Sequence, residues 1–159
     1  MRLRPRHPAR PEPGAPRLLV PFAGGHLDEA VLDAALRIAR ADGAVLVPAY
    51  LIIVPFSISL DAPLTHEVEV ALPLLEAAEL RAQKEGIPVD ARLERGRSLR
   101  DALRRLWDVE RFDRILLPVS ADHRNGFGER DIAWILMHAP TETLALRPAS
   151  GSVRERVAP

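Results

Sequence analysis

The chain has 159 residues, of which none is cysteine and only Lys84 is lysine. The absence of cysteine excludes disulfides, thiol nucleophiles and cysteine-ligated metals. Positive and negative charges balance at a formal net charge of zero, so no overall field favours nucleic acid or a membrane surface, and we expect neither as a partner. Apolar runs also stay short of the roughly 18 residues that span a bilayer.

The two ends of the chain lack the apolar periodicity of a folded domain. Residues 1–16 are rich in arginine and proline, which is typical of an extended or disordered arm. A basic arm can contact acidic partners, although a solvated tail is the simpler interpretation. Because this start has no apolar core like that of a signal peptide, we expect a cytoplasmic protein. Residues 149–159 are interpreted as a flexible tail, which leaves 17–148 as one domain with a single sizeable core.

Apolar strands alternate with amphipathic helices between these ends. The patterns predict strands at 18–22, 44–54, 89–94, 113–120 and 143–147, and helices at 27–42, 66–85, 98–109 and 129–138. This order is typical of a three-layer α/β fold, in which helices cover both faces of an open parallel sheet of the flavodoxin or Rossmann kind.

Two prolines interrupt this regular pattern. Pro48 lies inside the second predicted strand, where it removes a ladder donor, so we expect a bulge or a break there. Pro73 lies inside the second predicted helix, which should be kinked at that residue or begin at it. The third helix carries a clear start signal, because Ser98 and Asp101 form a capping box.

Two glycine-bearing loops, 23–26 and 121–128, follow the first and fourth predicted strands. In an open sheet of this class both loops lie at the carboxyl edge, at the switch point where ligands bind. A strand that leads through such a loop into a helix is also the arrangement from which α/β proteins build phosphate sites. The two loops are therefore the best indication of a functional site.

Five pieces of the chain, taken in order, resemble the universal stress protein family. They are Leu18–Phe22 (LLVPF), Ala39–Ala44 (ARADGA), Glu94–Gly96 (ERG), Phe112–Leu117 (FDRILL), and His138–Pro140 (HAP) followed by Leu144–Arg147 (LALR). The resemblance covers about residues 17–148. It implies a sheet of strand order 3-2-1-4-5 and a homodimer formed through the last strand, Thr143–Arg147. Many members of this family bind ATP without strong catalytic activity, and another branch does not bind it.

The nucleotide motif of the ATP-binding members is altered in this chain. That motif, Gly-x2-Gly-x9-Gly-Ser/Thr, would end on Glu129 and Arg130 here, and the usual aspartate after the first strand is replaced by Ala23. A glutamate at a helix start repels a triphosphate. The resemblance therefore implies a non-enzymatic stress-response or regulatory domain in which ATP binding is reduced or absent.

An alternative is an adenine-nucleotide-binding protein with a divergent phosphate loop, for which ATP, ADP or AMP are the candidate ligands. Arg124, Arg130 and His123 could hold an anion, although the loop glycines could equally serve only a turn while Glu129 complements the helix dipole. The candidate nucleotide-binding residues are Pro21, Phe22, Ala23, Ser120, Arg124, Gly126, Gly128 and Arg130.

Other candidate sites are weaker. A small hydrolase could use Ser120 and His123, but both lie in one loop without an oriented base, so we assign no catalytic residue. His66 and Glu69 share a helix face, yet two ligands are too few for a metal site. Two tryptophans, Trp107 and Trp134, are expected in the core rather than against a ligand, and Asp28 is expected to serve the start of a helix.

Overall fold

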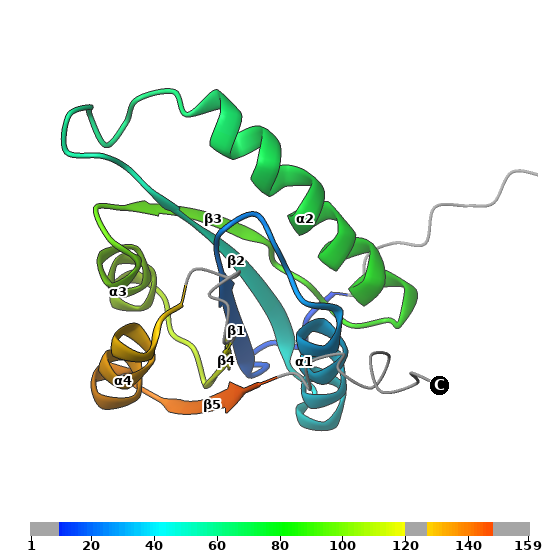
Figure 1. The fold of residues 1–159 in the computed structure, drawn as a ribbon. Helices are drawn as coiled ribbons and strands as arrows, with labels where there is room; N and C mark the ends of the chain where they lie inside the picture. The colour runs from blue at the N-terminus through cyan, green and yellow to red at the C-terminus, as the bar shows by residue number, and fades with distance from the viewer. Residues whose placement is uncertain (1–9, 120–126, 148–159) are drawn as a thin grey trace, which may run out of the picture.

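The computed structural model describes residues 10–119 and 127–147 (Figure 1). Strands and helices alternate along them in this order: β1 (Arg17–Phe22), α1 (Glu29–Asp42), β2 (Val45–Ile53), α2 (Thr65–Lys84), β3 (Arg92–Gly96), α3 (Leu99–Val109), β4 (Arg114–Pro118), α4 (Glu129–His138) and β5 (Glu142–Leu146). The predicted tail 149–159 and residues 1–9 of the predicted arm lie outside the described residues.

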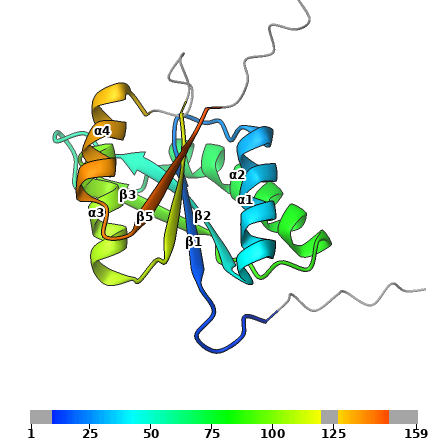
Figure 2. The ribbon, with the colours of Figure 1, turned by 90° about the horizontal axis from the view of Figure 1, so that it is seen from below.

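The strands form one parallel sheet in the order β3-β2-β1-β4-β5. Figure 2 shows that α1 and α2 cover one face of this sheet and that α3 and α4 cover the other. The predicted three-layer α/β class and the strand order 3-2-1-4-5 are therefore confirmed. β1 lies at the centre, between the two halves of the chain.

Apolar cores fill the space between the layers on both faces of the sheet, because successive side chains of a strand point to opposite faces. Leu19 of β1 packs with Leu103 of α3 and Ile135 of α4 in one core. Its neighbour Leu18 packs with Leu36 of α1 in a core on the other face. Both faces of the central strands are thus buried, which explains their continuous apolar sequence.

Pro48 neither bulges nor breaks β2, so that prediction was wrong. β2 runs uninterrupted from Val45 to Ile53 and pairs Pro48 with Val20 in register. The N–H groups of a strand point alternately to its two neighbours, so the N–H that Pro48 lacks would point the same way as that of Leu46. That direction is toward β3, not toward β1. The Leu46 N–H donates to the carbonyl of Pro88 at 2.8 Å.

Pro48 instead interrupts the pairing between β2 and β3. The pairing of β2 with this strand consists of one isolated bridge, from Leu46 to Val89, and a ladder that begins at Ala49 and Arg92. The interruption lies opposite Pro48, where no donor is present. The predicted strand 89–94 therefore becomes a regular strand only from Arg92.

Pro73 lies within α2, which is one helix from Thr65 to Lys84. The predicted alternative of a helix that begins at this proline was therefore wrong. The carbonyl of Glu69 loses its helical donor, but both residues are exposed, so water can satisfy that oxygen.

The starts of α1 and α3 are capped as the sequence predicts. The Asp28 carboxylate accepts from the N–H of Ala30 at 2.8 Å, and the Ser98 hydroxyl accepts from the N–H of Asp101 at 3.1 Å. In return, the backbone N–H of Arg97 donates to the Asp101 carboxylate at 2.8 Å. This hydrogen bond, together with the Arg105 guanidinium, lowers the pKa of Asp101.

Gly96 ends β3 directly against α3. A Cβ at this position would lie 2.4 Å from the backbone nitrogen of Ala102 and 2.6 Å from its Cα. The missing side chain therefore allows the close approach of α3 to β3.

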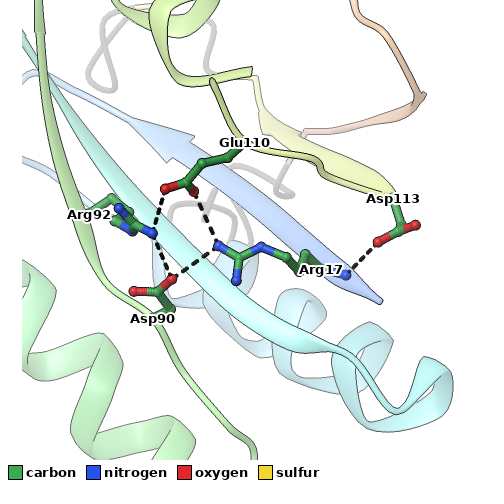
Figure 3. A network of polar contacts seen from close by, with 5 residues as sticks. All are labelled: Arg17, Asp90, Arg92, Glu110 and Asp113. Carbon is green, nitrogen blue, oxygen red and sulfur yellow. Dashed lines mark hydrogen bonds and ion pairs between the residues drawn. The ribbon is translucent and has the colours of Figure 1, made fainter. Parts of the chain in front are cut away.

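A network of charged side chains joins β1, β3 and α3 at the amino-terminal edge of the sheet (Figure 3). Arg17 reaches Asp90 at 3.0 Å and Glu110 at 3.3 Å. Arg92 reaches the same two carboxylates at 3.1 and 2.5 Å, and the backbone N–H of Arg17 donates to Asp113. Because two arginines share two partly buried carboxylates, the contacts support one another more than isolated surface pairs do.

Among residues 10–119 and 127–147, we find no helix that combines the length and the apolarity required to cross a membrane.

Candidate functional site

A cleft of about 300 Å³ lies at the carboxyl ends of β1 and β2, beside the first turns of α2 and α3. It is lined by Ala23, Gly24, Tyr50, Leu51, Ile52, Ile53, Glu67 and Leu99. Apolar side chains therefore form most of its wall, and Glu67 is the charged lining residue. The position at the carboxyl edge is the one that the strand order favours for a ligand.

β1 and β4 also part at this edge. Their ladder pairs Leu18 with Arg114 and Leu19 with Ile115, and it stops two residues before Pro21. Pro21 has no N–H with which to extend the ladder. The ladder between β1 and β4 therefore ends before the carboxyl ends of these strands, at the switch point of the sheet.

The loop after β1 is held against the end of β2. Gly24 and Gly25 have positive φ angles of 76° and 73°, which residues other than glycine rarely adopt. The N–H of Gly25 donates to the Tyr50 hydroxyl at 3.0 Å, and the Tyr50 ring meets Phe22 edge-on with centroids 5.3 Å apart. Tyr50 thereby fixes the loop on one side while its ring supports the core on the other.

Two arginines at the end of β3 hold the loop between β2 and α2. Arg97 donates to the carbonyls of Pro55 at 2.6 Å and Ile58 at 2.9 Å, and Arg95 donates to that of Ala62 at 2.5 Å. This loop separates Ile53 from Glu67, which both line the cleft. The arginines thus position the outer wall of the cleft through backbone oxygens.

α4 begins at Gly128, an N-cap without a side-chain hydrogen bond. Its first turn carries Glu129 and Asp131, and the Asp131 carboxylate is paired with Arg100 of α3 at 3.0 Å. Two carboxylates therefore occupy the positive end of this helix dipole, which is the position that a phosphate would otherwise take.

The two tryptophans, one on α3 and one on α4, pack against the apolar core. Trp107 and Trp134 stack with ring centroids 5.7 Å apart, and Trp134 also stacks on His138. Arg104 lies over the outer face of Trp134 at 5.0 Å. The tryptophans are therefore partly buried at the edge of the core, against which they pack, and not inside it as predicted.

The structure places the sequence-predicted site residues differently. Ala23 lines the cleft, whereas Pro21 and Phe22 are buried in the sheet, with no exposed surface on Phe22. Gly128 caps α4 and Arg130 is exposed on its first turn. The remaining candidates lie outside the described residues: Ser120, Arg124 and Gly126, together with His123 of the hydrolase hypothesis.

Sequence reasoning missed Tyr50, Ile53, Glu67 and Leu99 as lining residues. The carboxyl end of the second strand could have indicated Tyr50 and Ile53. Over the described part of the chain no cluster of three or more possible metal ligands is found, and His66 and Glu69 belong to none.

Comparisons of sequence give no relative, because no protein-family model and no curated protein match the chain. Solved structures do match. A universal stress protein family member from Burkholderia pseudomallei superposes with a TM-score of 0.64 at 21% identity, covering 86% of this chain and 98% of that one.

Two further matches are ligand complexes. A universal stress protein in complex with cAMP has a TM-score of 0.59 and 20% identity, over 84% of this chain and 97% of that one. A universal stress protein family protein from Arabidopsis thaliana with AMP bound has a TM-score of 0.58 and 13% identity, over 83% and 91%. The chain therefore has the fold of the universal stress proteins, the family that its sequence resembles.

Proposed function

We propose that this protein is a cytoplasmic member of the universal stress protein family that acts as a regulatory domain without catalysis, and that its ATP binding is reduced or absent. The start of α4 is the observation that carries the proposal. In the family motif a small Gly-Ser pair opens this helix, whereas here Glu129 and Arg130 stand at those positions and Asp131 follows.

Electrostatics favour this interpretation. A triphosphate near the start of α4 would meet the exposed carboxylate of Glu129, while the positive charge of Arg100 is already paired with Asp131. Like charges a few ångströms apart at a protein surface repel by a few kcal/mol, since the effective dielectric constant there is about 20. That repulsion offsets the attraction of the helix dipole, which contributes about 0.3–1 kcal/mol.

Restoring the family glycine tests the proposal. Titration calorimetry of the unmodified protein with ATP is expected to show no saturable binding in the micromolar range. The substitution Glu129→Gly restores the family glycine and removes the carboxylate while Arg130 keeps its positive charge, so it should raise ATP affinity about tenfold. Glu76→Gly, which removes a carboxylate from an exposed position of α2, is the control and should leave ATP affinity unchanged. Micromolar ATP binding by the unmodified protein would contradict the proposal.

The second candidate function is binding of an adenine nucleotide other than ATP, whose base the apolar cleft would suit. Its volume of about 300 Å³ is at the lower end of small-ligand pockets. Two structures of the same fold contain cAMP and AMP. The same calorimetry with AMP, ADP and cAMP separates this candidate from the first.

We also propose a homodimer formed through β5. This strand pairs with β4 on one side, and Ala145 is exposed. Because the carbonyl of Leu146 accepts from Val119 of the β4 side, the alternation of a strand directs the N–H of Ala145 to the outer edge. That edge can pair with a second copy of the strand.

Substitutions in β5 are expected to remove the dimer by two routes. Leu146→Asp, or Leu144→Asp, should break the dimer or unfold the chain, because both leucines pack against the core on the α1 side. Ala145→Pro removes only an outward N–H, so it should give a folded monomer. Light scattering gives the mass and circular dichroism reports the fold. Elution of the unmodified protein as a monomer would contradict the proposed homodimer.

A further inference from the structure

Among the described residues, the charged group that lines the cleft is a carboxylate. Glu67 lines the cleft from the first turn of α2 and is exposed. No hydrogen bond or ion pair of its carboxylate is found within residues 10–119 and 127–147. The carboxylate is therefore open to a ligand that enters the cleft.

Among the described residues, three arginines near the cleft are engaged elsewhere. Arg97 and Arg95 donate to carbonyls of the loop between β2 and α2. Arg100 is paired with Asp131 at 3.0 Å. A phosphate group in the cleft would have to compete with these contacts, because releasing either loop arginine leaves backbone oxygens without their donor.

The remaining wall favours a flat apolar body. Ile53 and Leu99 provide apolar surface at the mouth of the cleft, and Ile53 is 42% exposed. The Tyr50 hydroxyl accepts from the N–H of Gly25, which leaves its own hydrogen for a ligand acceptor. The cleft thus presents one donor, one carboxylate acceptor and apolar faces.

We propose that the cleft binds a flat heterocyclic base without a phosphate group, as a free base or a nucleoside, and that Glu67 determines this specificity. The carboxylate accepts a hydrogen bond from an amino group of the base and repels anionic ligands. The inference rests on the proposed function, since the universal stress protein fold and its adenine-containing complexes indicate the class of base.

Competition between adenosine and AMP tests the inference. Titration of the full chain should show adenosine binding about ten times more tightly than AMP, because the phosphate adds negative charge near a carboxylate. Glu67→Gln keeps the size and removes the charge, so the ratio should fall at least severalfold. Glu67→Lys should make AMP bind more tightly than adenosine. Glu69→Gln, two residues further along α2 and also exposed, is the matched control and should keep the ratio.

The possible outcomes are distinct. AMP binding as tight as adenosine in the unmodified protein, an unchanged ratio in Glu67→Gln, or no saturable adenosine binding would each overturn the inference. If neither adenosine nor ATP shows saturable binding, the proposed regulatory function remains intact. Micromolar ATP binding overturns the proposed function instead, and the Glu67→Gln ratio still reports on the specificity residue separately. Circular dichroism of each variant confirms that the fold is retained.

Discussion

Replacing Gly96 with alanine is expected to lower the free energy of unfolding by about 3 kcal/mol. The added Cβ would lie 2.4 Å from the nitrogen and 2.6 Å from the Cα of Ala102, which are backbone atoms of α3. A flexible side chain could move away from such a contact, but a helix backbone moves only as a unit. The relief would shift α3 away from β3 and loosen the core around Leu103 and Leu106. Urea unfolding followed by circular dichroism measures the change.

Two further variants make this prediction specific. Gly43→Ala places a methyl group at a positive φ of 63° with no neighbouring atom within 4 Å, so it should cost only about 1 kcal/mol. Adding Ala102→Gly to Gly96→Ala removes the Cβ contact but leaves the two closer backbone contacts, and a glycine inside α3 itself costs about 1 kcal/mol, so this second change should not rescue stability. A Gly96→Ala protein as stable as the unmodified one would show that α3 does not approach β3 this closely.

Replacing Phe22 with alanine is expected to cost about 4 kcal/mol, the range of fully buried phenylalanines. Phe22 has no exposed surface, meets Tyr50 edge-on and packs with Ala71 and Leu75 of α2. The cavity would lie beneath the loop that carries Gly25, so any loss of ligand binding should follow the loss of stability.

Phe56→Ala provides the matched control, because the same atoms are removed from a ring that is 85% exposed. That ring contacts the Arg97 guanidinium at 5.3 Å, so the expected cost is below about 1 kcal/mol. Thermal and urea unfolding of the pair gives the difference. If both phenylalanine variants lost similar stability, the assignment of Phe22 to the core would be contradicted.

Local chemistry made most of the fold predictable. The apolar runs of β1 and β2 indicated buried strands, and Ser98 and Asp28 marked helix starts that the structure confirms. The expected effect of Pro48 was placed on the wrong strand. Its missing donor matters only to the neighbour on one side, and which neighbour stands there depends on the register of β3.

The site was less predictable than the fold, because its wall comes from segments far apart in the chain. Ala23 could be found from the loop after β1, but Glu67 looked like an ordinary charge in the first turn of a helix. Its approach to the cleft depends on the loop that Arg95 and Arg97 hold, and no local pattern specifies that contact. Phe22 lies next to the loop in sequence, yet the alternation of β1 turns its side chain into the core.

β1 precedes the other strands of this sheet in sequence, but its second neighbour, β4, comes only after β2 and β3. β1 pairs with β2 across the crossover that contains α1, but its other neighbour is β4, and Asp113, whose carboxylate accepts the Arg17 N–H, lies 96 positions after Arg17. A nascent chain that has made only β1, β2 and β3 therefore carries an unpaired apolar edge at the future centre of its sheet, which is a template for association with other chains. Arrival of residues 114–118 closes that edge, so the two halves of the sheet become one cooperative unit only when β4 docks.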